Sequence, residues 1–226
     1  MKTHIRKIVY GAIATLVFSL AAVSAKAGTI TLTFEGLQNL EPIDNYYNGG
    51  LGGFGSGPGS NYGIVFGSDS LAVISNLDGG TGNISNLPSG DTAAFFLSGA
   101  GDVMDVSAGF STGFSFFYSA PGFGGTVDVY SGLDGTGTLL AALTLPTTAS
   151  GCGPDAYSCW DPIGVTFSGS AESVIFSGTA NYIAFDNITL GSSTPGTGST
   201  TPEPASLLLL GTGLLGVGFM LSRRNA

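Results

Sequence analysis

The sequence predicts an all-β protein built as an antiparallel β-sandwich. Apolar and polar residues alternate over short stretches along most of the chain between residues 29 and 191, as they do in half-buried strands. Turn clusters such as Asp78-Gly79-Gly80 separate these stretches. No stretch of this region has a sustained helical period. These three observations favour ten or eleven short strands in a jelly-roll-like sandwich.

The strands can be assigned in order from the period of two. In the first, residues 29–35, threonines alternate with Ile30, Leu32 and Phe34, which predicts one buried face and one solvent face. The later predicted strands cover residues 63–67, 71–75, 93–97, 103–106, 113–118, 126–130, 139–145, 165–167, 173–176 and 182–190.

The last predicted strand changes its apolar phase part-way along. Ile183 and Phe185 share one parity, whereas Ile188 and Leu190 share the other. A shift of one residue moves a strand's apolar residues to the opposite face, so an extra residue is needed to keep all four inside. The pattern therefore predicts a β-bulge at Asp186-Asn187.

The N-terminal residues 1–27 have the pattern of a signal peptide. A basic stretch is followed by an apolar segment, expected as a signal helix, and then by Ala25-Lys26-Ala27, where Ala25 and Ala27 form a small-x-small cleavage site. We expect the mature chain to start at or near Gly28. The next domain, 28–191, is long enough for one hydrophobic core.

The C-terminal residues 202–226 have three parts, after a Ser/Thr/Gly/Pro linker at 192–201. The tripeptide Pro202-Glu203-Pro204 comes first, followed by an uncharged run at 205–221 and then by Arg223 and Arg224. As a helix this run is roughly 26 Å long, against a hydrocarbon core of about 30 Å. We expect a transmembrane helix whose arginines stay on the cytoplasmic side of the inner membrane.

This tail resembles the PEP-CTERM sorting signal, also known as the ice-binding protein C-terminal motif. The resemblance implies recognition of Pro202-Glu203-Pro204 by exosortase, a membrane transpeptidase. It implies export, transient anchoring by the C-terminal helix, and transfer to the cell surface or extracellular matrix. Proteins with this signal accompany exopolysaccharide production and biofilm formation. An ordinary C-terminal anchor is the alternative.

Charge is distributed unevenly along the chain. All six Lys and Arg residues lie in the two terminal segments, and residues 28–201 contain no Lys, Arg or His. The same segment holds fourteen of the fifteen acidic residues, so its charge is near −14. Binding to nucleic acid depends on cations that neutralise phosphates, so nucleic acid is excluded as a partner.

The missing residue types also restrict catalysis. Without His, Lys or Arg, residues 28–201 cannot form a Ser-His or Cys-His dyad, a Schiff base or a cationic clamp. The G-x-S-x-G sequence at 109–113 is attributed to chance in a chain with 38 glycines. We expect no catalytic residues; a glycoside hydrolase that uses only carboxylates is the remaining enzymatic alternative.

Cys152 and Cys159 are the only two cysteines. In an exported protein they are expected to form one disulfide. The redox-active alternative is disfavoured because six intervening residues do not match a thioredoxin-like motif. A zinc site lacks further Cys or His ligands.

Residues 110–190 resemble the recurrent domain of PEP-CTERM proteins, which is similar to galactose-binding-like jelly rolls and carbohydrate-binding modules. The resemblance is strongest over Ala184-Phe185-Asp186-Asn187-Ile188. It implies a structural calcium that joins the first strand to the last, here through Glu35, Asp186 and the nearby Asn187. An anionic domain without cations would gain from such an ion. The alternative is that Glu35 and Asp186 are solvated edge residues.

Two further features leave alternatives open. The glycine-rich segment 48–63 predicts a mobile surface loop or a ligand loop with aromatic neighbours. Trp160 predicts a core plug or a sugar-stacking platform. From all these features we expect a structural or interaction protein of the biofilm or exopolysaccharide matrix, with a carbohydrate-binding module as the alternative. Its partners would be exosortase and matrix glycans; the ligand-binding residues are unknown.

Overall fold

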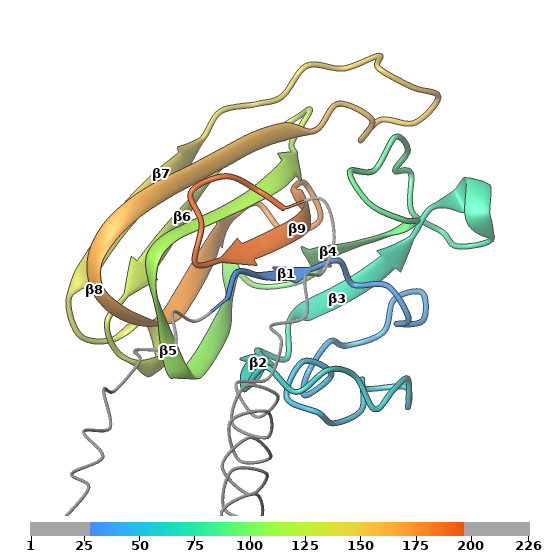
Figure 1. Cartoon of the computed structure of the whole chain (residues 1–226). Helices are drawn as coiled ribbons and strands as arrows, with labels where there is room; N and C mark the ends of the chain where they lie inside the picture. The colour runs from blue at the N-terminus through green and yellow to red at the C-terminus, as the bar shows by residue number, and fades with distance from the viewer. Residues whose placement is uncertain (1–27, 197–226) are drawn as a thin grey trace, which may run out of the picture.

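The computed structural model describes residues 28–196, which contain nine β-strands and two short 3-10 helices (Figure 1). The predicted signal peptide, its cleavage site at Ala25 and Ala27, and the predicted transmembrane helix lie outside the described residues. Within residues 28–196, no helix has the length and hydropathy needed to cross a bilayer. The predicted all-β class is confirmed.

All strand pairs are antiparallel. The strands are β1 (Ile30–Leu32), β2 (Ile64–Phe66), β3 (Ser70–Ile74), β4 (Thr92–Phe96), β5 (Gly101–Ser119), β6 (Gly125–Tyr130), β7 (Leu139–Leu145), β8 (Asp161–Gly178) and β9 (Ala184–Leu190). The two helices are η1 (Asn76–Asp78) and η2 (Leu133–Gly135).

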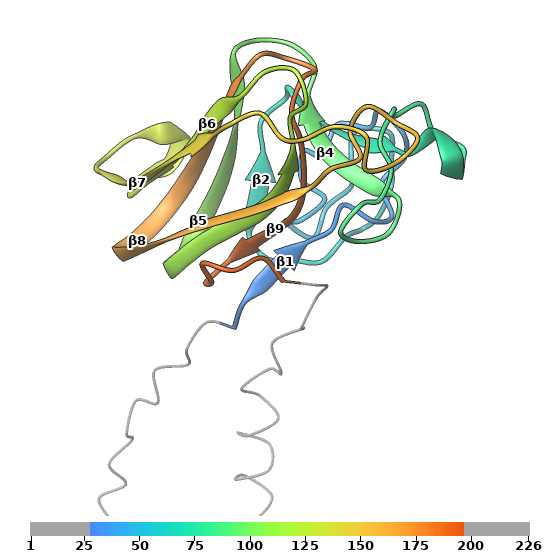
Figure 2. The same ribbon diagram turned by 90° about the horizontal axis from the view of Figure 1, so that it is seen from above.

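One continuous sheet folds over itself to make the sandwich. Its strand order is β3-β4-β9-β5-β8-β6-β7, with β1 paired to β9 and β2 to β5. The long strands β5 and β8 run through both layers. The first part of β5 pairs with β2, and the last part pairs with β9. Register shifts between Asp105 and Thr112 mark the fold between these parts, and Figure 2 shows the layers from above.

The prediction of ten or eleven strands was wrong in one respect. The predicted strands 103–106 and 113–118 are both parts of β5, and 165–167 and 173–176 are both parts of β8. Gly109 and Thr112 have φ of 68° and 76°, so the chain changes register there without reversing. Glycine and serine in these segments therefore accommodate bulges, not turns.

The predicted bulge in the last strand is confirmed. Ser115 pairs with Thr189 and Phe117 pairs with Asp186, so β9 has one more residue than β5 between these two pairs. Asn187 takes up the extra length with φ of 49°. As a result, every residue of β9 is buried.

Aromatic side chains fill the space between the layers. Phe116 is fully buried and its ring contacts those of Phe114, Tyr118, Phe176 and Phe185, at centroid distances of 5.6–6.3 Å. These residues come from β5, β8 and β9, the three strands at the centre of the sheet order.

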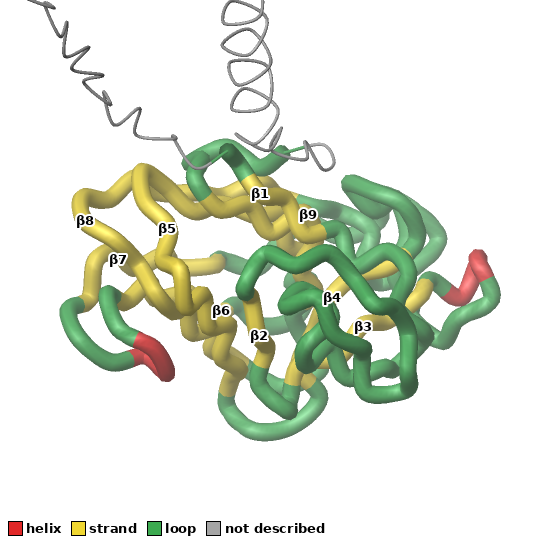
Figure 3. The backbone as a smooth tube through the Cα atoms, turned by 60° about the horizontal axis from the view of Figure 1, so that its bottom comes forward, coloured by secondary structure: helices red, strands yellow, loops and turns green. Residues whose placement is uncertain are grey.

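A second, smaller apolar cluster lies on the outer face of β3, β4 and β9. Alternation along β4 sends Ala94 and Phe96 to the main core and Ala93 and Phe95 to the outer cluster. Loops gather around β3 and β4 (Figure 3). Trp160 packs against the cluster and donates a hydrogen bond from its indole N–H to the Ser85 carbonyl, 3.0 Å away, as expected for a plug.

The chain that follows β9 is attached to the sandwich. The Gly196 N–H donates to the Thr189 hydroxyl over 3.0 Å, and the Gly196 carbonyl accepts from the Asn187 amide over 2.8 Å. Residues 192–196, assigned from sequence to the linker, thus belong structurally to the domain. These bonds place Gly196 beside Asn187 and Thr189, which are about 10 and 17 Å from Ala184 along the strand.

Candidate functional site

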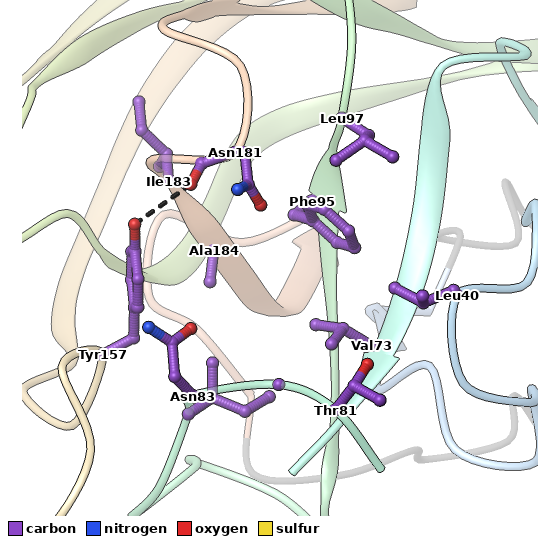
Figure 4. Close-up of a pocket in the computed structure, with 12 residues that line it drawn as sticks. Leu40, Val73, Thr81, Asn83, Phe95, Leu97, Tyr157, Asn181, Ile183 and Ala184 are labelled. Carbon is purple, nitrogen blue, oxygen red and sulfur yellow. Dashed lines mark hydrogen bonds between the residues drawn. The ribbon is translucent and has the colours of Figure 1, made fainter. Parts of the chain in front are cut away.

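A pocket lies on the outer face of the β3-β4-β9 layer, against the second apolar cluster. Its cavity has a volume of about 230 Å³. Val73 from β3, Phe95 from β4 and Ala184 from β9 form the floor (Figure 4). The outward faces of three neighbouring strands therefore supply its apolar surface.

Two loops that are distant in sequence close the sides of the pocket. The Ser85 N–H donates to the Tyr157 carbonyl, and the Tyr157 N–H donates to the Asn83 carbonyl, both over 3.1 Å. These bonds form a short parallel bridge between Ile84 and Tyr157. The bridge fixes the position of the Tyr157 ring beside the floor.

Polar groups surround the mouth of the pocket. The Tyr157 hydroxyl donates to the Asn181 carbonyl over 3.1 Å, and Figure 4 shows the amides of Asn83 and Asn181 on either side of the cavity. Neither amide side chain has a hydrogen-bond partner among the described residues. Each is thus available to donate to and accept from a ligand.

No carboxylate lines this pocket, although the domain has fourteen of them. An apolar floor with a few polar groups at fixed positions is typical of small-molecule sites. The chemistry suits an uncharged ligand that has one apolar face and several hydroxyl groups.

The predicted disulfide is confirmed and closes the loop that carries Tyr157. Cys152 and Cys159 are bonded, with their Cα atoms 5.2 Å apart. The Cys152 carbonyl accepts a hydrogen bond from the Asn86 amide over 2.7 Å, which ties this loop to the opposite one. The covalent link therefore holds a wall of the pocket.

Replacing both cysteines, Cys152→Ser with Cys159→Ser, is expected to lower the free energy of unfolding by about 2.5 kcal/mol, the chain-entropy value for so short a loop. Urea unfolding of the two proteins measures the difference. Dithiothreitol should destabilise the wild type to the same extent and leave the double variant unchanged. Equal stability of wild type and variant would contradict a structural role for the bond.

A group of carboxylates lies at the other end of the loop that carries Asn83. The Asp186 side chain is fully buried and accepts hydrogen bonds from the Ser89 N–H at 3.0 Å and the Asn187 N–H at 2.6 Å. The Ser89 hydroxyl bonds to both Asp186 and Asn187. Burial raises the pKa of Asp186 to about 8, and the charge of Glu35 adds to this effect.

Glu35 comes from the chain just after β1. The predicted strand 29–35 is shorter than expected, because Phe34 has φ of 65° and the chain turns away after Leu32. Glu35 accepts hydrogen bonds from the N–H groups of Asp91 and Thr92, both over 3.1 Å. Burial raises its pKa, and the neighbouring Asp91 carboxylate contributes to the increase.

The charge of Glu35 thus acts on Asp186; Asp186 is fully buried, whereas Glu35 is partly exposed. Their oxygen atoms are the hard ligands that calcium prefers. Among residues 28–196, no group of three or more His, Cys, Asp or Glu side chains is arranged to hold a metal ion. A calcium ion would therefore need Glu35, Asp186, the Asn187 amide and main-chain oxygens together, and its binding stays a proposal.

The glycine-rich segment 48–63 is held by a buried carboxylate. Glu41 is fully buried and accepts hydrogen bonds from the N–H groups of Phe54 and Ser56, at 2.8 and 3.0 Å. Tyr47, one of the aromatic neighbours of this segment, is buried and packs against Phe34 with a ring-centroid distance of 5.8 Å. Its hydroxyl accepts the Phe34 N–H, so it supports the core.

Residues 200–224 match the PEP-CTERM protein-sorting motif. The PEP-CTERM match covers Pro202-Glu203-Pro204, Arg223 and Arg224, all of which lie outside the described residues. The predicted sorting motif is confirmed, and the PEP-CTERM motif indicates an exported protein that is sorted by exosortase. No curated protein sequence matches the chain.

Three solved structures illustrate the similarities found for the domain. A family 6 module from Bacillus halodurans that binds β-1,3-glucan has 17% identity and a TM-score of 0.36, over 55% of this chain and 87% of that one. A carbohydrate-binding module from a Cellvibrio mixtus lichenase, in complex with cellotriose, has 15% identity and a TM-score of 0.35, over 55% of this chain and 88% of that one. An arabinoxylan arabinofuranohydrolase from Bacillus subtilis has 21% identity and a TM-score of 0.39, over 58% of this chain and 27% of that one. TM-scores this low do not establish a common fold.

The sequence did not reveal the pocket. Its lining comes from separate segments: Leu40, Val73, the stretch from Thr81 to Ile84, Phe95 with Leu97, Tyr157, and the stretch from Asn181 to Ala184. No spacing rule connects these segments. The one available signal was the position of Tyr157 inside the disulfide loop.

Proposed function

We propose that this chain is a non-catalytic, surface-sorted protein whose sandwich binds a neutral glycan of the extracellular matrix. The pocket carries the proposal, because it joins an apolar floor to two unpaired amides and contains no carboxylate. A pyranose ring has an apolar face formed by its C–H groups and hydroxyls around its edge. Phe95 and Tyr157 would contact the face, and Asn83 and Asn181 would bond the hydroxyls.

The charge of the domain narrows the class of glycan. Residues 28–196 hold fourteen carboxylates and no Lys, Arg or His. Anionic polysaccharides would be repelled by such a surface and would find no cationic partner on it. A neutral polysaccharide meets neither obstacle.

The position of the pocket suits a protein anchored through its C-terminus. The described chain ends at Gly196, which bonds to Thr189 near the end of β9. The pocket includes Ala184 at the beginning of the same strand, about 17 Å from Thr189. The signal peptide at 1–27, the domain at 28–191 and the anchor at 205–221 complete the proposed organisation, with biofilm exopolysaccharide as the source of the glycan.

The carboxylates do not favour the glycoside hydrolase alternative. Such enzymes need an acid and a base that flank a sugar in a cleft. Glu35 and Asp186 accept main-chain hydrogen bonds, and Asp186 is fully buried. They suit the structural calcium proposed above.

Binding can be tested with the purified domain, residues 28–196, against neutral and anionic polysaccharides by affinity electrophoresis and calorimetry. We expect retention by a neutral polysaccharide that changes little with salt concentration. Asn83→Ala should weaken binding about tenfold, because it removes one hydrogen bond to a ligand hydroxyl. Tyr157→Phe should weaken binding by a similar factor, because it removes the hydrogen bond that holds Asn181.

Asn48→Ala is the matched control, since it removes an exposed amide outside the pocket. It should bind like the wild type. Binding only to anionic polymers, or equal binding by all three variants, would overturn the assignment of the pocket. Failure to bind any glycan would leave a purely structural role in the matrix as the function to pursue.

A further inference from the structure

Two aromatic rings are exposed together beside the pocket. Phe123 lies in the loop between β5 and β6, and Tyr182 lies in the loop between β8 and β9. Phe123 is 51% exposed and Tyr182 is 41% exposed. Their ring centroids are 4.7 Å apart and their planes meet at 77°, so each ring supports the other and still leaves apolar surface in water.

The pair is directly connected to the pocket. Tyr182 lies between Asn181 and Ile183, both of which line the cavity. The Asn181 carbonyl holds the Tyr157 hydroxyl. Burial raises the pKa of Tyr157, and the charge of Tyr182 raises it further. Exposed aromatic surface thus continues from the pocket wall outward to Phe123.

The backbone gives this pair a fixed base. The Tyr182 N–H donates to the Thr179 carbonyl over 3.2 Å, and the Asn181 N–H donates to the Phe96 carbonyl over 2.8 Å. Gly122 lies beneath the Tyr182 ring, where a Cβ atom would be 3.5 Å from the ring. The two segments that carry the rings, 118–125 and 179–185, contain no acidic residue.

We propose that Phe123 and Tyr182 form a second sugar-binding position, so that the protein holds an internal segment of a neutral polysaccharide and not a single terminal sugar. This inference rests on the proposed glycan-binding function. One sugar occupies the pocket, and the chain continues over Tyr157 to the exposed rings. Such a pair exposes apolar surface to water, and a sugar face covers it without needing charge.

Calorimetry with neutral glucose oligosaccharides, from the monosaccharide to the hexasaccharide in both β-1,3 and β-1,4 linkage, tests the proposal on the 28–196 domain. The wild type should bind longer oligosaccharides at least about tenfold more tightly than the monosaccharide. Phe123→Ala and Tyr182→Ala should remove this gain and leave monosaccharide affinity unchanged. Phe54→Ala is the matched control, because Phe54 is 60% exposed and lies outside both positions.

The outcomes separate this inference from the function on which it rests. Equal affinity for short and long oligosaccharides, or an unchanged gain in Phe123→Ala and Tyr182→Ala, overturns the second position and leaves glycan binding in the pocket intact. Loss of monosaccharide binding in these variants also overturns it, because the rings would then act through the pocket. No binding by the wild type to any member overturns both proposals. Thermal unfolding of each variant checks that the fold is kept.

Discussion

In the presence of a chelator, the folded domain should lose stability as the pH rises from about 4 to about 8. Asp186 is the cause, because burial raises its folded pKa to about 8 whereas an unfolded aspartate has a pKa near its ordinary value. Between these two pH values the folded state keeps a proton that the unfolded state has lost. The free energy of unfolding therefore decreases, by on the order of 5 kcal/mol across the range.

Asp186→Asn should remove this dependence, since the amide has the shape of the protonated acid and does not titrate. Urea unfolding at a series of pH values measures the effect. The difference in free energy of unfolding between variant and wild type should shift steadily in favour of the variant as the pH rises. The Asn amide has only one oxygen for the N–H groups of Ser89 and Asn187, so the variant should be the less stable protein at pH 4. Asp78→Asn, which removes an exposed carboxyl in η1, is the control and should follow the wild type. An Asp186→Asn curve parallel to the wild type would contradict the assignment.

Calcium should counteract the decrease in the free energy of unfolding at high pH. An ion held by Glu35, Asp186 and Asn187 binds the ionised carboxylates and stabilises the folded state by mass action. Adding calcium at pH 8 should then restore much of the stability of the wild type and do little for Asp186→Asn. A pH dependence that persists unchanged in calcium would remove the calcium proposal and would leave the titration of Asp186 standing.

The strands show what local sequence can and cannot determine. The period of two located 139–145 as β7 and placed the bulge in β9, because apolar parity depends only on neighbouring residues. The same period of two wrongly divided β5 into two strands near Gly109, because glycine is compatible with both a turn and a bulge. The choice depends on the pairing of β5 with β8, which involves residues more than 40 positions away.

The carboxylate group and the pocket also differ in how far the sequence reveals them. Glu35 and Asp186 were assigned through a resemblance that joins the first strand to the last, and in the structure the charge of Glu35 acts on Asp186. The pocket had no comparable signal, because Asn83, Tyr157 and Asn181 meet only after two loops pack over the outer face of the sheet. Glu41 was not predicted to have any role, since nothing in its surroundings in the sequence shows that a glycine-rich segment folds around it.

Glu41→Gln is expected to lower the free energy of unfolding by roughly 2–4 kcal/mol. The Glu41 carboxylate accepts the N–H groups of Gln38, Phe54 and Ser56, and an amide offers only one oxygen for them. Although burial acts to raise the pKa of Glu41, the hydrogen bonds from Ser56, Gln38 and Phe54 outweigh it and leave the pKa lowered. This group therefore adds stability above the unfolded pKa, and the contribution is lost as the pH falls through the folded pKa.

Two measurements distinguish this role from a simple packing defect. Amide hydrogen exchange at Phe54 and Ser56 should accelerate strongly in Glu41→Gln, while the amides of β9 should change only as much as global stability does. The loss of stability below about pH 4.5 should also be smaller in the variant than in the wild type. If the Phe54 and Ser56 amides exchange rapidly in the wild type as well, the segment 48–63 is not held by Glu41.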